Sequence, residues 1–184
     1  RAGLEVYWHR PIRDGTQGQR NANGGQVSKK VCVLGLGYVG LPTATLLAVG
    51  GYSVVGVDTD TGVVESLLKA DPHIQEPNLS DMVRDTLKSG NLRIRSLPEE
   101  ADVFIIAVPT PITPERKADL CAVEAAAKSI LPHLRKGNLI ILESTVPPGT
   151  TQNIVLPILK QALLGKDEEI YLAHAPERVL PGNI

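Results

Sequence analysis

Three glycines in the stretch "VLGLGYVG" have the spacing of a phosphate-binding loop. Gly35, Gly37 and Gly40 form G-x-G-x-x-G directly after an apolar run and at the start of a helical pattern. The first glycine permits a tight turn, the second lets the backbone approach a pyrophosphate, and the third lets the helix lie close to the strand. The helix N-terminus then offers N–H groups to phosphates. Three glycines alone also suit a plain turn, but this context favours a dinucleotide site.

Asp58 ends the second apolar run, in "SVVGVDTDTG". A carboxylate at this place accepts hydrogen bonds from the hydroxyl groups of an adenosine ribose, and it repels the 2′-phosphate of NADP. No arginine or lysine follows Asp58 within this stretch to neutralise such a phosphate. The sequence therefore predicts NAD as the cofactor.

Two loops that follow apolar runs carry hydroxyl side chains. "AVPTP" contains Val108 and Thr110, and "ESTVPPGTT" contains Ser144 and Thr145. Ligands of open α/β sheets lie outside the carboxyl ends of the strands, so we expect both loops to face the cofactor. We expect the Thr110 hydroxyl to remain free to bond, and Ser144 and Thr145 to present hydroxyls near the nicotinamide. The alternative for the second loop is a turn that leads into a helix.

A fourth stretch, "HAPERVLPG", follows the last apolar run and contains Glu177 and Arg178. A glutamate and an arginine there suit a general base and an anion ligand. A salt-bridged surface loop is the alternative. The histidines and the two cysteines share no spacing typical of a metal site or a disulfide framework, so no metal site is predicted.

The composition favours small-molecule partners. The chain has 19 basic and 20 acidic residues among 184, and these charges are scattered rather than clustered. Such a balance creates no field that would attract nucleic acid or an anionic membrane. No apolar run approaches the roughly 20 residues that span a bilayer, and the N-terminus lacks the apolar core of a secretory signal. We therefore expect a soluble, cytoplasmic protein.

From Lys30 onward, short β-branched runs alternate with helical patterns, which is typical of βαβ units around a parallel sheet. The predicted strands lie at 30–35, 53–58, 92–95, 102–107, 139–143 and 170–174, and the predicted helices at about 38–50, 61–70, 79–89, 120–134 and 150–164. Six strands with crossover helices indicate an α/β fold, a doubly wound Rossmann sheet that is mainly parallel with helices on both faces.

Two details of this prediction concern boundaries. Ser80 is predicted to cap one helix, and Thr150 or Thr151 another. Residues 1–28 show no sustained periodicity and are interpreted as a flexible tail or arm. The domain itself is predicted to occupy residues 29–184.

Several motifs in this order resemble the UDP-glucose/GDP-mannose dehydrogenase family: "GLGYVGLP", "GVDTD", "EPNL", "AVPTP", "ADL", "ESTVPPGTT" and "APERVLPG". The resemblance covers residues 29 to 184 nearly continuously. "PERVLPG" and "ILEST" are most similar to the UDP-N-acetyl-D-mannosamine dehydrogenases of the family. UDP-glucose 6-dehydrogenases usually have a second glutamate where this chain has Pro181, which argues against UDP-glucose.

This resemblance implies a four-electron oxidation of the C6 alcohol of a UDP-sugar by two NAD, through an aldehyde captured by a cysteine and a thioester hydrolysed by water. It implies NAD contacts from Tyr38, Val39, Asp58, Thr110 and Thr145. Thr145 is also expected to order a catalytic water. Glu177 is the implied base for hydrolysis, and Arg178 with Val179 are the implied contacts to the nucleotide sugar.

The resemblance also implies that the nucleophilic cysteine, a catalytic lysine and much of the substrate pocket belong to segments that would follow residue 184. We therefore expect this chain to be the NAD-binding part of such an enzyme, inactive alone, with a homodimeric full-length protein. UDP-glucose or UDP-N-acetylglucosamine are alternative substrates. A non-catalytic NAD-binding module is the alternative of another class.

Overall fold

The computed structural model describes residues 29–74, 76–161 and 169–176, so the predicted tail at 1–28 lies outside the described residues. One sheet contains six strands in the order β3-β2-β1-β4-β5-β6, and all neighbouring pairs are parallel. The strands are β1 (Lys30–Leu34), β2 (Ser53–Val57), β3 (Leu92–Arg95), β4 (Val103–Ile106), β5 (Leu139–Leu142) and β6 (Tyr171–His174). The predicted doubly wound sheet is confirmed, and it is wholly parallel in the described residues.

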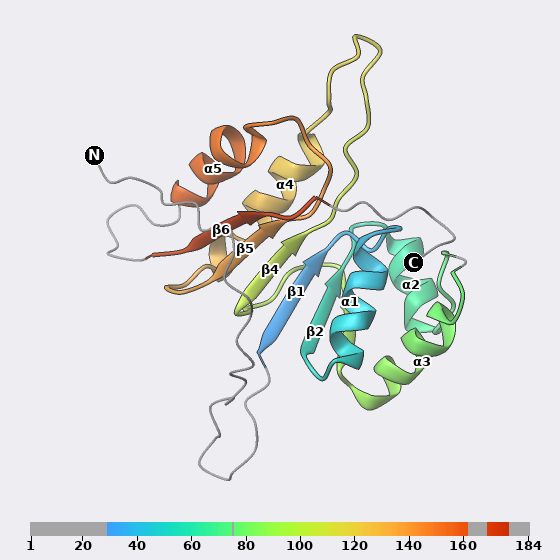
Figure 1. Ribbon diagram of the computed structural model, residues 1–184. Coiled ribbons are helices and arrows are strands. Elements are labelled where there is room, and N and C mark those ends of the chain that lie inside the picture. Colours follow the sequence, from blue (N-terminus) through green and yellow to red (C-terminus); the bar gives the residue numbers. More distant parts are fainter. Residues whose placement is uncertain (1–28, 75, 162–168, 177–184) are drawn as a thin grey trace, which may run out of the picture.

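The helices cover both faces of this sheet (Figure 1). They are α1 (Gly40–Val49), α2 (Thr61–Leu68), α3 (Leu79–Ser89), α4 (Cys121–Ser129) and α5 (Leu156–Gln161), with short 3-10 and π segments at η1 (Leu131–His133) and η2 (Thr151–Val155). Helices α1 to α3 pack on one face and α4 with α5 on the other. Each helix in the described ranges is too short or too polar to cross a membrane.

Burial on both faces explains the strand sequences. Along β1, Val31 and Val33 join the core beneath α1 to α3, while Cys32 and Leu34 join the core beneath α4 and α5. A parallel strand with helices on both sides needs apolar residues at every position, so its sequence reads as a continuous run rather than an alternation. The apolar runs therefore identified β1, β2 and β4 correctly, whereas the edge strand β3 (LRIR) alternates buried Leu92 and Ile94 with two more exposed arginines.

The predicted cap at Ser80 is wrong, and Thr150 lies at the predicted helix start without a capping hydrogen bond from its side chain. Helix α3 begins at Leu79, whose side chain is buried, and it follows Asn78 in a left-handed conformation with φ 64° and no side-chain cap. The Thr150 hydroxyl donates backwards to the Pro147 carbonyl at 2.7 Å, and its own backbone is already helical. Neither helix start therefore relies on a side-chain cap, and at α3 the first helical residue is the buried Leu79.

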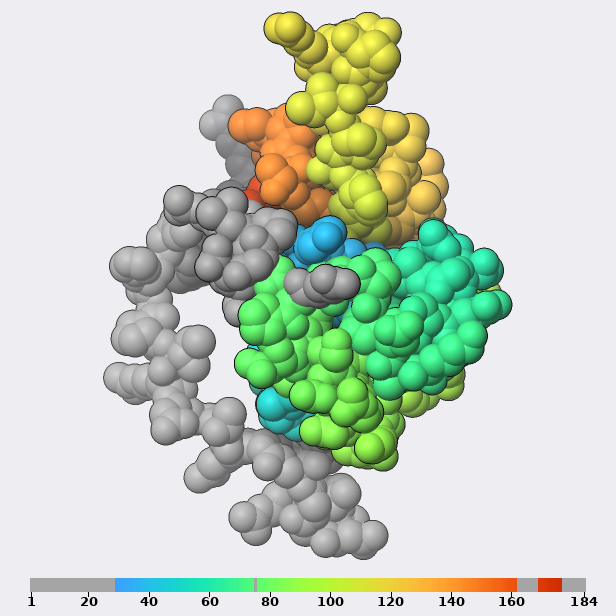
Figure 2. Space-filling view, turned by 90° about the vertical axis from the view of Figure 1, so that its right-hand side faces the viewer, coloured from blue at the N-terminus to red at the C-terminus, as the bar shows by residue number. Residues whose placement is uncertain are grey.

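The connection from β4 to α4 projects from the body of the molecule, where it forms the yellow protrusion in Figure 2. An antiparallel bridge within this connection joins Ile112 to Ala118. The predicted helix at 120–134 is divided, because Pro132 lies in the 3-10 turn η1 and lacks the N–H that a continuing α-helix requires.

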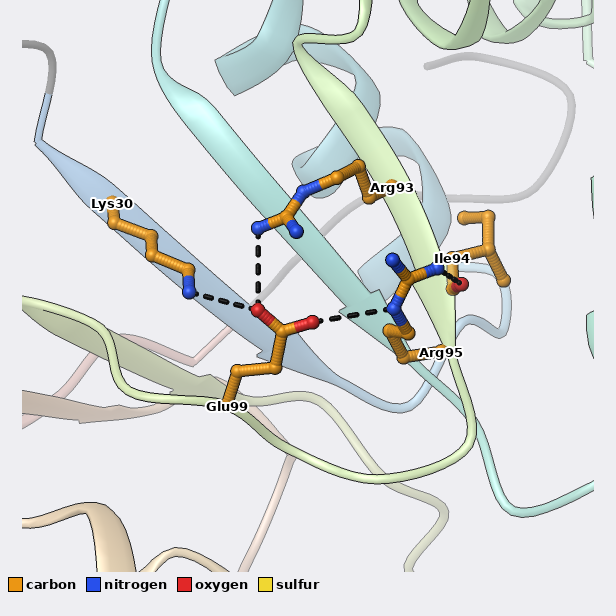
Figure 3. Close-up of polar contacts among 5 residues, drawn as sticks. All are labelled: Lys30, Arg93, Ile94, Arg95 and Glu99. Carbon is orange, nitrogen blue, oxygen red and sulfur yellow. Dashed lines mark hydrogen bonds and ion pairs between the residues drawn. The ribbon is translucent and has the colours of Figure 1, made fainter.

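The connection from β3 to β4 contains no helix in the structure, although it crosses two strands. Its Glu99 carboxylate is held by three cations of the sheet (Figure 3), namely Lys30 Nζ at 2.8 Å, Arg93 Nη2 at 3.2 Å and Arg95 Nε at 3.2 Å. Ala101 of the same connection is fully buried in the core beneath α4. Ion pairs and one small apolar contact therefore hold this crossover against the sheet.

The Glu99 cluster predicts a stability that depends on pH. The hydrogen bond from Lys30, supported by the two arginines, lowers the pKa of Glu99 below its ordinary value of 4.5. A carboxylate with a lowered folded pKa contributes stability that is fully present above about pH 4.5 and is lost as the pH falls through the folded pKa. We expect Glu99→Gln to reduce the free energy of unfolding at pH 7 by about 1 kcal/mol, because the pairs are partly exposed.

Urea unfolding of both proteins from pH 7 down to pH 3 measures this difference. The two stabilities should converge at the acid end. Glu100→Gln is the matched control, since Glu100 forms no ion pair with a described residue. A difference between wild type and Glu99→Gln that stays constant with pH would contradict the assignment.

Candidate functional site

The first and third glycines allow three backbone segments to meet at the carboxyl end of β1. Gly35 has φ +90°, and a Cβ there would lie 2.5 Å from the Ala107 carbonyl oxygen, in the loop after β4. A Cβ on Gly40, the first residue of α1, would lie 1.8 Å from the Gly35 carbonyl oxygen. Any other residue at Gly40 would therefore push α1 away from β1.

Gly37 differs from these two, because nothing lies within 4 Å of where its Cβ would be. The backbone N–H groups of residues 37–40 donate to no other described residue, and α1 has no side-chain cap at Val39. Open space beside unpaired N–H groups at a helix N-terminus suits a pyrophosphate, whose oxygens accept such bonds. This part of the chain therefore fits a dinucleotide cofactor, and the exposed Tyr38 lies at its rim.

Asp58 holds the glycine loop as well as lying at the tip of β2. One carboxylate oxygen accepts a hydrogen bond from the Leu36 N–H at 2.8 Å, and the other accepts from the Asp60 N–H at 2.9 Å. These bonds leave lone pairs on both oxygens that remain available to ribose hydroxyls. The sequence did not reveal the bond to Leu36, because the two residues are 22 positions apart and only the parallel pairing of β1 and β2 brings them together.

The loops after β4 and β5 are hydrogen-bonded to each other by the predicted hydroxyl residues. Ser144 Oγ donates to the Val108 carbonyl at 2.8 Å, and Thr110 Oγ1 donates to the Thr145 carbonyl at 2.7 Å. The Thr110 hydroxyl proton is therefore not free as expected, although its lone pairs can still accept a hydrogen bond. The Ser144 side chain is buried, whereas Thr145 is exposed at the same edge.

The remaining predicted residues divide into two groups. Glu177, Arg178 and Val179 lie outside the described residues, so their roles stay predictions. Neither cysteine is activated: burial raises the pKa of Cys32 to about 11, and a hydrogen bond with Asp119 raises the pKa of the exposed Cys121. The described residues contain no group of three side chains arranged to hold a metal ion.

Comparison with known proteins supports the cofactor that this geometry suits. The model of the UDP-glucose/GDP-mannose dehydrogenase family, NAD binding domain, matches residues 29–184. This chain belongs to that family. It forms the family's NAD-binding domain, and NAD is the cofactor of this domain.

Relatives within the family are similar over most of this chain. A UDP-N-acetyl-D-mannosamine dehydrogenase of Methanocaldococcus jannaschii is 48% identical over 161 residues, which is 86% of this chain and 36% of the relative. An NDP-N-acetyl-D-galactosaminuronic acid dehydrogenase of Ralstonia solanacearum is 44% identical over 163 residues, 85% of this chain and 38% of the relative. The chain thus spans little more than a third of the length of these proteins.

A solved structure shows the same architecture. The UDP-N-acetyl-mannosamine dehydrogenase of Staphylococcus aureus has a TM-score of 0.78 and 45% identity, with 83% of this chain and 38% of that chain covered. The match extends the agreement from sequence to fold, so the edge of the sheet described above belongs to a fold shared with this relative.

The two glycine environments predict opposite effects of the same substitution. Gly37→Ala should leave the thermal midpoint within about 2 °C of wild type, since its methyl group meets no described atom, yet weaken NAD binding at least tenfold because the methyl occupies the pyrophosphate position. Gly40→Ala should destabilise the fold itself, because its methyl group collides with backbone. Thermal melts and calorimetric titration with NAD distinguish these outcomes. Unchanged NAD affinity in a folded Gly37→Ala would contradict the assigned site.

Proposed function

We propose that this chain supplies the NAD site of a nucleotide-sugar 6-dehydrogenase that oxidises the C6 alcohol of UDP-N-acetyl-D-mannosamine to the uronic acid with two NAD. The open space at Gly37, in the loop that Asp58 holds through the Leu36 N–H, is the observation that supports the NAD part of this proposal. The sugar part is supported by the names of relatives that are 44–49% identical to this chain.

The residue roles within this reaction are part of the same proposal. Thr145 contacts NAD and orders the hydrolytic water, a role supported by its exposure at the carboxyl edge of the sheet. Glu177 removes a proton from that water, since a thioester is attacked efficiently when a positioned base assists. Arg178 and Val179 contact the UDP-sugar. We further propose that the full-length protein is a cytoplasmic homodimer.

Asp58 predicts the choice between NAD and NADP. Asp58→Asn removes the charge that repels a 2′-phosphate and one acceptor for the adenosine ribose, so NAD affinity should fall about tenfold and the preference for NAD over NADP should shrink. Asp60→Asn is the matched control, because Asp60 caps α2 through Gly62 N–H and Val63 N–H. Calorimetric titration of each variant with both dinucleotides gives the two affinities. An unchanged preference in Asp58→Asn would refute the ribose assignment.

The proposed function also predicts that this chain and the full-length protein differ in their ability to form NADH. The 184-residue chain should bind NAD but form no NADH from UDP-N-acetyl-D-mannosamine. The full-length protein should form two NADH per sugar. The ultraviolet absorbance of NADH measures both outcomes. UDP-glucose and UDP-N-acetylglucosamine, run in parallel, test the alternative substrates. No NADH from any of the three with the full-length protein would favour a non-catalytic NAD-binding module.

A further inference from the structure

The β4–β5 pairing changes character at the edge that carries the nucleotide site. The regular ladder ends at the pair Ile106 and Leu142. Two further backbone bonds converge on the Ile106 carbonyl, from Glu143 N–H at 2.8 Å and Ser144 N–H at 3.2 Å. Beyond this point the loop after β4 contains Pro109 and Pro111, which have no N–H to donate, so a backbone ladder cannot continue there.

Two hydroxyl groups take over where the backbone ladder stops. Ser144 of the β5 loop donates to Val108 of the β4 loop, and Thr110 of the β4 loop donates back to Thr145 of the β5 loop, at 2.8 and 2.7 Å. Donor and acceptor alternate between the loops, and Ser144 Oγ also makes a longer contact of 3.4 Å with the Ile106 carbonyl at the end of β4. We call this reciprocal pair the hydroxyl clasp.

The hydroxyl clasp adjoins the glycine turn, because its residue Val108 packs against Gly35. The Val108 Cα lies 3.1 Å and the Ala107 carbonyl oxygen 2.5 Å from the position of a Cβ on Gly35. The Ala107 N–H also donates to the Leu34 carbonyl at 2.8 Å. A shift of the β4 loop would therefore move the backbone against which the first glycine packs.

The position of the hydroxyl clasp in the sheet also indicates which half of the dinucleotide lies near it. Asp58, which suits the adenosine ribose, lies at β2, on one side of β1. The clasp joins β4 and β5, on the other side of β1. A dinucleotide that crosses the edge at the glycine loop thus carries its nicotinamide half toward the clasp.

We propose that Ser144 and Thr110 are positioning residues that hold the two loops in the geometry required by the nicotinamide half of NAD, an inference that rests on the proposed function. Ser144 acts through Val108 and makes no cofactor contact through its buried hydroxyl. The single hydroxyl proton of Thr110 is committed to Thr145, so Thr110 presents lone pairs to a ligand and accepts from it rather than donates.

The test compares NAD with ADP-ribose, which lacks the nicotinamide, by calorimetric titration of the 184-residue chain. Thr110→Val and Ser144→Ala should each weaken NAD binding about tenfold and change ADP-ribose binding less than twofold. Thr110→Ser retains the donor and should restore NAD affinity. Thr86→Val is the matched control, because the Thr86 hydroxyl also donates to backbone carbonyls, at Met82 and Val83, but on α3. It should lower the thermal midpoint without changing either affinity.

The ratio of the two affinities separates positioning from general loss of stability, and thermal melts identify any variant that fails to fold. Ratios equal to wild type in both Thr110→Val and Ser144→Ala, or a Thr110→Ser variant that behaves like Thr110→Val, would overturn the clasp. Failure of the wild-type chain to bind either NAD or ADP-ribose would instead overturn the NAD assignment itself, and the clasp with it.

Discussion

The site depends on the absence of two methyl groups. Gly35 and Gly40 allow the end of β1, the start of α1 and the loop after β4 to meet at distances that no side chain tolerates. This close packing fixes the N-terminus of α1 at the carboxyl edge of the sheet, with unpaired N–H groups beside open space at Gly37. The N–H donors and the open space that a pyrophosphate needs at this edge both follow from this close approach of the backbone segments.

Polar side chains then join the loops around this junction. The Asp58 carboxylate links the glycine loop to β2, and the hydroxyl clasp links the β4 and β5 loops. On the crossover between β3 and β4, Glu99 performs a similar task with three cations. In each case a side chain provides a bond that the backbone cannot make, because the strands have ended or a proline has removed a donor. Asp58, Thr110 and Ser144, which the sequence predicts as cofactor contacts, thus also join neighbouring segments of the fold.

Much of the fold could be predicted because its signals are local. Strands such as β1 and β4 are apolar at successive positions, and such runs follow directly from burial on both faces. The cap predicted at Ser80 was wrong because α3 begins one residue earlier, at Leu79, whose burial in the core depends on tertiary packing. Sequence patterns locate an element more reliably than they locate its first residue.

The sequence by itself determined the order of strands and helices, the three glycines with Asp58, and the resemblance to the family, because each is carried by neighbouring residues along the chain. The tertiary structure alone decided how the hydroxyls are used. Thr110 and Thr145 are 35 positions apart, and the single proton of Thr110 is committed to the Thr145 carbonyl once parallel pairing of β4 with β5 brings their loops together. A hydroxyl's partner depends on which carbonyl lies within 3 Å, and spacing along the chain does not specify that distance.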